Sequence, residues 1–143
     1  MIDSAKSFLS SAGAGTFSFS NSLNGVNYFI QIKHRNSLET WSKTTQTFVS
    51  NAMTYNFTTA NTQAYGDNQI QADSSPVRFA VYSGDVNQDG TVDASDVSVA
   101  DNDAYNSVSG YVNTDVTGDD FVDAGDVSIV DNNAFNAVSV ITP

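Results

Sequence analysis

The sequence predicts a chain of mixed class, with an all-β sandwich over residues 1–82 and a small α domain over residues 83–143. Short apolar stretches with a period of two fill the first part, whereas the second part repeats one pattern of an acidic loop followed by a helix-length segment. All five basic residues precede Gly84, and twelve of the sixteen acidic residues lie between Asp85 and Asp131. The two parts therefore differ in both pattern and charge.

Composition indicates a folded chain and narrows its function. The 143 residues are enough for two small domains, and 40% hydrophobic residues are enough for a packed core. The absence of cysteine excludes disulfides and is typical of an exported bacterial protein that relies on metal instead. The first part carries +5 − 4 = +1 and the second −12, so no basic patch predicts binding to nucleic acid. No apolar run approaches the ~18–20 residues of a membrane span, and any signal peptide is expected to have been removed or to lie upstream.

The first part is expected to form five short strands, over residues 17–19, 28–32, 41–48, 53–57 and 77–81. Asn24-Gly25 lies between the first two strands and predicts a hairpin turn that joins them. The polar passage 58–75 is expected to be a long loop. Strands of this length and spacing predict a β-sandwich.

A twelve-residue stretch, DVNQDGTVDASD, begins the second part at Asp85. Oxygen-bearing side chains occupy its positions 1, 3, 5, 9 and 12, and Gly90 occupies position 6. This is the layout of a calcium loop, in which alternate residues turn oxygen atoms inward and the glycine allows a sharp turn. The predicted ligands are the side chains of Asp85, Asn87, Asp89, Asp93 and Asp96 and the backbone carbonyl of Thr91.

The pattern returns thirty residues later. DVTGDDFVDAGD, residues 115–126, repeats the loop, and DVSIVDNNAFNAVS, residues 126–139, repeats DVSVADNDAYNSVS, residues 96–109. A single acidic loop can be a solvated turn, but two copies in one register argue against that interpretation. Neither copy follows a clear amphipathic helix, so each is interpreted as half an EF-hand, a loop with an exit helix.

Each loop is expected to lead into a helix with a narrow apolar stripe. In the first helix the stripe is Val97, Ala100, Ala104 and Val108 with Tyr105 beside them, and in the second it is Val127, Val130, Ala134 and Val138 with Phe135. Neither stripe is wide enough to fold alone, so we expect the helices to pack together, antiparallel and with near two-fold pseudo-symmetry. Asp96 and Asp126 are expected to close the loops and to start the helices. Asp101 and Asp131 are placed on the outer face, without a ligand role.

The tandem of loops and helices over about residues 83–139 resembles a type I dockerin. Members of that family bind two calcium ions and attach enzymes or surface proteins to cohesin receptors on extracellular scaffolds. The resemblance implies a second calcium site, with ligands at the positions that match the first site: Asp115, Thr117, Asp119, the carbonyl of Phe121, Asp123 and Asp126.

Two departures from the family pattern predict that the second site is the weaker one. Thr117 offers a neutral hydroxyl where Asp or Asn is usual. Asp120 replaces the turn glycine, and a left-handed backbone there costs roughly 1 kcal/mol. The positions that often carry cohesin recognition hold small residues, namely Ala94, Ser95, Ala124 and Gly125, and they do not identify a receptor.

Residues 17–42 and 77–90 are similar to a small prealbumin-like sandwich that precedes dockerins in some exported bacterial surface proteins. That resemblance implies a further strand before the position of Met1–Lys6. A sandwich that lacks this edge strand exposes unpaired backbone, which a neighbouring chain can fill by strand addition.

Other candidates for chemistry are weak, and no enzyme is expected. His34 is the only histidine and has no partner for a catalytic triad, so it is interpreted as a surface strand residue. Glu39 is the sole glutamate, and a glycosidase pair requires Asp67 or Asp73 from a loop. Four aromatic residues are candidates for a carbohydrate platform, although aromatic residues at strand spacing more often belong to a core: Tyr28, Trp41, Tyr55 and Tyr65.

Two functions from different classes remain, and both require two calcium ions. In the first, favoured by the dockerin resemblance, the chain is a non-catalytic module outside the cell or on a bacterial surface. Its second part docks onto a cohesin-like receptor or another surface partner, and the sandwich is a spacer. In the second, copies of the chain assemble by strand addition into a calcium-stabilised extracellular filament. This function is favoured by the start of the sequence at Met1, after the expected edge strand, and by the small residues at the recognition positions.

Overall fold

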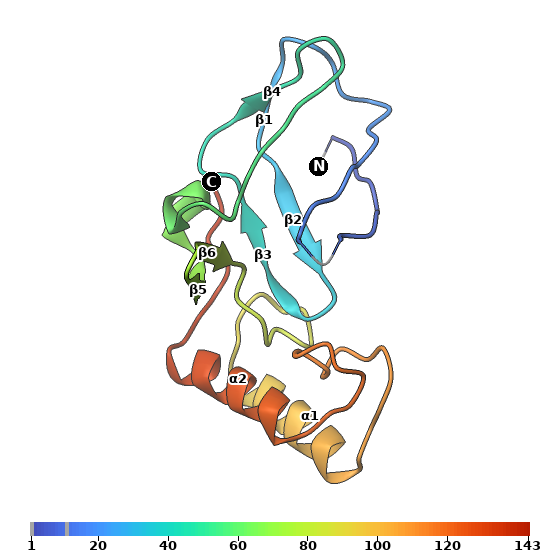
Figure 1. Ribbon diagram of the computed structural model, residues 1–143, viewed down its shortest axis with the longest axis vertical. Coiled ribbons are helices and arrows are strands. Elements are labelled where there is room, and N and C mark those ends of the chain that lie inside the picture. Colours follow the sequence, from blue (N-terminus) through green and yellow to red (C-terminus); the bar gives the residue numbers. More distant parts are fainter. Residues whose placement is uncertain (1, 11) are drawn as a thin grey trace. The chain divides into compact units, whose positions relative to one another are not determined.

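The computed structural model describes residues 2–10 and 12–143. It confirms a mixed class of fold, in which short antiparallel strands precede two helices (Figure 1). The strands are β1 (Asn27–Tyr28), β2 (Gln31–His34), β3 (Ser37–Trp41), β4 (Gln46–Thr47), β5 (Ile70–Ser74) and β6 (Val77–Ala80). The helices are α1 (Ala94–Tyr105) and α2 (Ala124–Phe135), and two 3₁₀ turns, η1 (Asn61–Gln63) and η2 (Tyr65–Asp67), lie between β4 and β5.

The described strands pair two by two. β1 pairs with β4, β2 with β3 and β5 with β6, all antiparallel. In the β2–β3 hairpin Gln31 faces Trp41 and His34 faces Ser37, with an irregularity in between. The expected sandwich of two larger sheets is therefore not confirmed.

Four local expectations for the first part are wrong. Residues 17–19 form no strand, and the hairpin through Asn24-Gly25 does not form because β1 takes β4 as its partner. Residues 53–57 are also not a strand, and residues 58–75, expected to be a loop, contain β5. Alternation of apolar and polar residues fits a strand, but it does not say which other segment will supply the hydrogen bonds.

Contacts divide the chain into two compact units. The first comprises the described part of Met1–Tyr28 together with Thr45–Tyr55. The second comprises Phe29–Thr44 and Asn56–Pro143, so it holds the hairpins β2–β3 and β5–β6 and both helices. The domain boundary between residues 82 and 83 stays a prediction.

The first unit begins with an extended segment. Its described residues between 2 and 23 form neither helix nor strand. Asp3 Oδ2 accepts the N–H of Asn21 at 2.7 Å, and the ring of Phe19 contacts Phe48 edge to face. Other apolar side chains are exposed, and Phe8 is 96% exposed. Met1 lies outside the described residues, and the strand expected before Met1–Lys6 stays a prediction.

Helices α1 and α2 are twelve residues long and start in the same way. Asp93 and Asp123 are the N-caps. In each helix the carboxylate three positions later, Asp96 or Asp126, accepts a hydrogen bond from the N–H of the N-cap residue. The prediction that Asp96 and Asp126 start the helices is therefore three positions late, because the preceding aspartates already satisfy the first free N–H groups. Neither helix is long and apolar enough to cross a membrane.

The core of the second unit joins the helices to the β2–β3 hairpin. Val92, Ala100 and Val130 pack with Leu38 of β3, and all four are buried. Val97, Val127, Ala134 and Val138 are partly buried against this cluster, as the apolar stripes predict. Tyr105 and Phe135 do not belong to it, since each is 88% exposed. Each is the last residue of its helix.

Candidate metal centre

The two acidic loops share their backbone conformation. In the first loop Gln88 and Gly90 have positive φ, at 61° and 93°, and in the second Gly118 and Asp120 have φ of 81° and 68°. Asp120 thus adopts the left-handed conformation that its position predicts. Each loop contains one glycine and one non-glycine residue in that region, so backbone strain does not distinguish the two loops.

Each loop is held by the segment that follows the helix of the other repeat. In the first loop Val92 donates its N–H to the carbonyl of Val138, and Gly90 accepts from Val140, both at 2.8 Å. In the second loop Val122 donates to Val108 at 2.9 Å, and Gly110 donates to Asp120 at 2.8 Å. The repeats are therefore interlocked, and this exchange gives the helical part its pseudo-symmetry.

The carboxylates at position 12 close the loops. Asp96 is fully buried and accepts the N–H groups of Val86, Asn87 and Asp93 at 2.8, 3.2 and 3.0 Å. Asp126 accepts the equivalent N–H groups at 2.8, 2.9 and 3.0 Å, which come from Val116, Thr117 and Asp123. Burial raises the pKa of Asp126, but these backbone hydrogen bonds outweigh it and hold that pKa below its ordinary value.

The remaining side chains of the first loop form successive turns. Asn87 Oδ1 accepts the N–H of Asp89, and Asp89 Oδ1 accepts the N–H of Thr91. Asp93 Oδ1 accepts the N–H and the hydroxyl of Ser95, and these two bonds lower the pKa of Asp93. The loop is thus ordered by its own oxygen atoms, at the positions where calcium ligands were predicted.

Asp85, at position 1, differs from all of these. Its residue is only 2% exposed, and Oδ2 accepts a single bond, from the N–H of Gly90 at 3.2 Å. Its Oδ1 is buried and has no hydrogen-bond partner among the residues that the structure describes. Burial, followed by the neighbouring charges of Asp96 and Asp89, raises the pKa of Asp85. A buried anionic oxygen without a partner is costly and favours a cation beside it.

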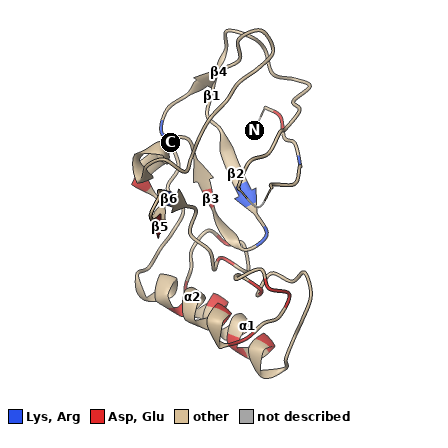
Figure 2. Ribbon diagram, viewed as in Figure 1, with Lys and Arg blue, Asp and Glu red and all other residues tan. Residues whose placement is uncertain are grey.

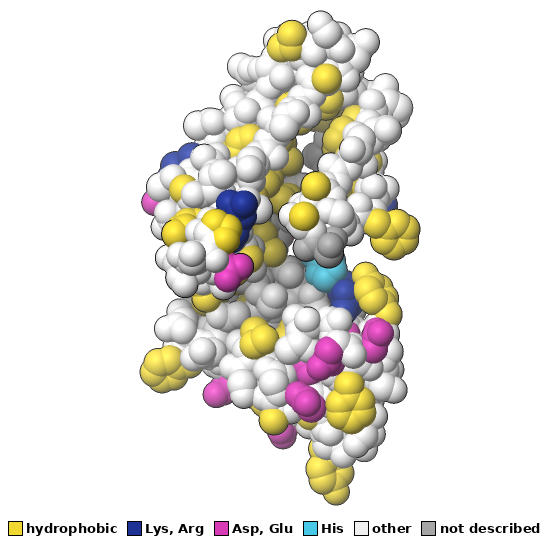
Figure 3. Space-filling model, in the orientation of Figure 1, with side chains coloured by type: hydrophobic (Ala, Val, Ile, Leu, Met, Phe, Trp, Pro, Cys, Tyr) yellow, Lys and Arg dark blue, Asp and Glu magenta, His cyan; other side chains and the backbone are white. Residues whose placement is uncertain are grey.

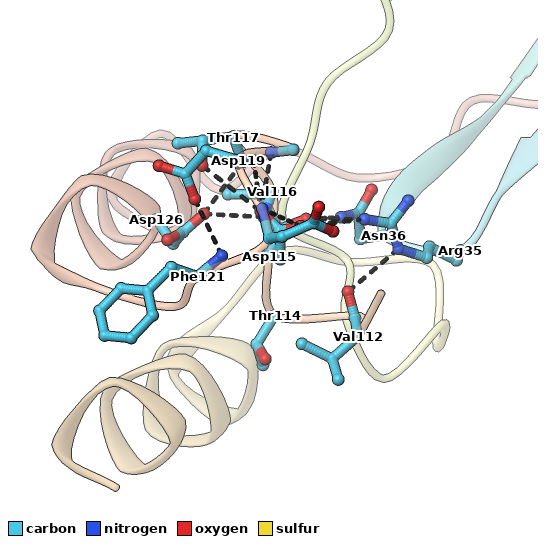
Figure 4. Close-up of polar contacts among 12 residues, drawn as sticks. Arg35, Asn36, Val112, Thr114, Asp115, Val116, Thr117, Asp119, Phe121 and Asp126 are labelled. Carbon is cyan, nitrogen blue, oxygen red and sulfur yellow. Dashed lines mark hydrogen bonds and ion pairs between the residues drawn. The ribbon is translucent and has the colours of Figure 1, made fainter. Parts of the chain in front are cut away.

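Asp115, the equivalent residue of the second loop, is fully satisfied (Figure 4). Oδ1 accepts the N–H groups of Gly118 and Asp119 at 2.7 and 3.2 Å and the hydroxyl of Thr117 at 3.4 Å. Oδ2 accepts the N–H of Asp120 at 3.3 Å and lies 3.6 Å from a guanidinium nitrogen of Arg35. Arg35 therefore places a cation beside the position 1 carboxylate of the second loop, and among the described residues no cation pairs with Asp85 in the first loop.

Acidic residues gather on the loops and helices of the second part, whereas basic residues lie mainly on the strands and connecting segments (Figure 2). Beside the first loop lies a small cavity of about 160 Å³, lined by Asp85, Asp89, Lys33 and Glu39 among others. Asp85 lines this cavity, and because Lys33 lines it too, the wall of the cavity is less acidic than the loop.

The predicted ligands fall into two loops, but their carboxylates do not converge on one point. Among the described residues, no group of three or more Asp, Glu or His side chains is close enough to hold a metal ion together. Each carboxylate is instead turned toward nearby N–H groups. An ionised carboxylate has about four acceptor sites, so these bonds leave capacity for a metal. Hard oxygen donors on a short loop suit calcium. Asp85 Oδ1 is the loop oxygen that is buried without a hydrogen-bond partner among the described residues, so it gains most from a bound cation.

The sequence-based candidates outside the loops have other interaction partners or belong to different compact units. His34, Arg35 and Asn36 are joined by hydrogen bonds at the turn between β2 and β3. Glu39 accepts from the indole of Trp41, and Asp67 pairs with Lys43. The four aromatic candidates are divided between the two compact units, with Tyr28 and Tyr55 in the first and Trp41 and Tyr65 in the second.

Three residues near the loops were missed by sequence reasoning. Arg35 and Asn36 reach the second loop across about eighty positions of sequence, and Gln88 donates to the carbonyl of Asp85 at 2.6 Å. Nothing in the local pattern marks Arg35 or Asn36. The sequence signal for the left-handed backbone at Gln88 is indirect: the equivalent position of the second loop is a glycine, Gly118.

No protein-family model, curated protein or solved structure matches this chain. The class that the geometry defines is a mixed α and β chain with two interlocked acidic loop–helix repeats.

Proposed function

We propose that the chain is a non-catalytic, calcium-binding module for protein interaction, located outside the cell or on a bacterial surface. The dockerin-like part binds two calcium ions and docks onto a cohesin-like receptor or another surface partner, with the β part, expected to be a sandwich, as a spacer. The observation that carries the proposal is the buried, unpartnered Oδ1 of Asp85 in a loop whose spacing is that of a calcium loop.

The surface of the helical part supports an interaction role. Apolar side chains are exposed at matching positions of the two helices, Val99 with Ile129 and Tyr105 with Phe135. Hydrophobic side chains stand among acidic ones on the face that Figure 3 shows. Exposed aromatic residues are common in protein interfaces, where they supply much of the contact area.

Calcium titration by calorimetry tests the proposal. The wild-type chain is expected to bind two ions, and Asp96→Ala and Asp126→Ala are expected to reduce the stoichiometry to one each. Asp101→Ala and Asp131→Ala are matched controls, because both residues are exposed on the helices. Absence of calcium binding by the wild-type chain, or a stoichiometry of two in either ligand variant, contradicts the proposal.

A specific observation favours the alternative, in which copies of the chain assemble into a filament. The described residues between 2 and 23 leave Ile2, Phe8 and Leu9 exposed and pair with no strand. Two-stranded sheets also have outer edges that can accept a strand from another chain, although part of the outer edges of β3 and β6 is bonded to Tyr82 and Thr58. An extended apolar segment and open sheet edges are the two halves of a strand-addition interface.

Light scattering and negative-stain imaging in millimolar calcium, and then in chelator, separate the two functions. A monomer that gains helix with calcium supports docking to a receptor. Filaments that dissociate in chelator support self-assembly. If filaments form, Phe8→Asp with Leu9→Asp is expected to abolish them and to leave the calcium stoichiometry unchanged, because these residues are distant in sequence from both loops.

A further inference from the structure

We propose that Arg35 is the built-in counter-cation of the second loop. Its guanidinium holds the Asp115 carboxylate in a closed loop without a metal ion and thereby weakens calcium binding there. The response to calcium is then concentrated in the first loop. This inference rests on the proposed calcium-binding function and adds to it a residue that the family-like loop pattern does not contain.

Arg35 is fixed in place by several contacts from the segment between the repeats. Its Nε donates to the carbonyl of Val112 and its Nη2 to the carbonyl of Asp115, both at 3.0 Å. The guanidinium lies 3.8 Å from the centre of the Tyr111 ring. Its side chain is 17% exposed and that of Asp115 is 1% exposed, so this ion pair is largely shielded from water.

The neighbours of Arg35 complete the arrangement. Nη1 of Arg35 lies 3.2 Å from Nε2 of His34, which must accept because a guanidinium only donates. Nδ1 of His34 then carries the proton and donates to Oδ1 of Asn36 at 2.9 Å. The amide of Asn36 in turn donates to the carbonyl of Asp115 at 2.8 Å. The whole turn between β2 and β3 therefore supports the first residue of the second loop.

Among the described residues, no cation pairs with the position 1 carboxylate of the first loop; Lys33 lines the cavity beside Asp85 but forms no ion pair with it. There the carbonyl of Asp85 accepts from Gln88, a neutral amide, and Oδ1 of Asp85 has no partner. The two loops thus differ in how the charge of their buried position 1 carboxylate is compensated. A protein cation neutralises Asp115, whereas Asp85 stays an unneutralised buried carboxylate.

This difference has opposite consequences for the two states of the second loop. Without metal, Arg35 stabilises the loop, because it offsets the charge of a buried carboxylate. With metal, the same guanidinium repels the incoming dication, so less free energy is gained on binding. Removal of Arg35 must therefore loosen the metal-free loop and tighten calcium binding. The N–H groups of Gly118, Asp119 and Asp120 keep Asp115 oriented when Arg35 is absent.

Arg35→Gln tests the inference in two measurements. Hydrogen exchange in chelator is expected to be faster at the amides of residues 116–126, with residues 86–96 changed less. Calcium titration is performed in an Asp85→Asn background, which disables the first site so that only the second loop titrates. There Arg35→Gln is expected to lower the dissociation constant about tenfold, which corresponds to about 1.4 kcal/mol. Arg35→Lys keeps the charge, and Arg78→Gln removes an exposed charge on β6; neither is expected to tighten binding.

The outcomes separate this inference from the proposed function. Wild-type protein that binds no calcium overturns the proposed function, while the exchange measurement still decides whether Arg35 holds the second loop. If calcium binds but Arg35→Gln leaves the affinity of the second loop unchanged or lowers it, the inference is wrong. It is also wrong if exchange at residues 116–126 in chelator is unchanged. Tightening by Arg78→Gln as well would mean that net charge, and not the position of Arg35, sets the affinity.

Discussion

Val92 donates its backbone N–H to the carbonyl of Val138 at 2.8 Å, which ties the middle of the first loop to the segment after α2. The equivalent bond from Val122 to Val108 ties the second loop to the segment after α1. The loop of each repeat is therefore held in part by the other repeat, and we expect damage to one repeat to loosen the loop of the other.

This interlock predicts the effect of Asp126→Ala on both loops. The substitution removes the acceptor of three part-buried hydrogen bonds, from the N–H groups of Val116, Thr117 and Asp123, a loss on the order of 3 kcal/mol in the free energy of unfolding. Hydrogen exchange in chelator is expected to show faster exchange at Val92 as well as in the second loop. Asp131→Ala is the control on the same helix. Unchanged protection of Val92 would show that the repeats fold independently.

Asp85→Asn is expected to stabilise the chain in chelator while it abolishes the first calcium site. The pKa of Asp85 is raised by burial, so its charged form is disfavoured in the folded chain. The protonated form contributes stability that is fully present below the ordinary pKa of 3.8 and is lost as pH rises through the raised folded-state pKa.

Urea unfolding of Asp85→Asn and the wild type over this pH range, in chelator, measures the effect. The advantage of the variant is expected to grow as pH rises. An Asp85→Asn chain that is less stable than the wild type at neutral pH in chelator would contradict the assignment of an unneutralised charge at this position.

Asp120→Gly is expected to stabilise the metal-free chain by up to about 1 kcal/mol. Asp120 has φ of 68°, a conformation that glycine adopts without strain. Gly118→Ala places a strained residue at φ of 81° in the same loop and is expected to have the opposite sign. Denaturation midpoints in chelator measure both variants, and the same sign for both would rule out backbone strain as the cause.

Leu38→Ala is expected to destabilise the helices although Leu38 lies in β3. Its side chain packs with Val92, Ala100 and Val130, and removal of a buried leucine side chain costs about 2–5 kcal/mol. Circular dichroism of the helices during unfolding is the appropriate measurement, and Leu23→Ala, at an exposed position, is the control. If the helices melt as in the wild type, residues 83–143 form a domain of their own.

The sequence by itself determined the repeat and its local chemistry. The loop spacing, the left-handed backbone at Asp120, the two helices and most of their apolar stripes follow from interactions between residues close in the chain, because turns and helix caps are local. The same local rules predicted the period of the strands. They did not predict the pairing of β1 with β4, because a period of two does not specify a partner.

Only the tertiary structure decided which loop carries a cation. Asp85 and Asp115 are equivalent in sequence, yet Arg35 approaches only Asp115, from a turn about eighty positions earlier. The attachment of Leu38 to the helices is of the same kind. The physical reason is that burial and long-range charge depend on where the chain returns in space, and a repeat in sequence does not fix the surroundings of its copies.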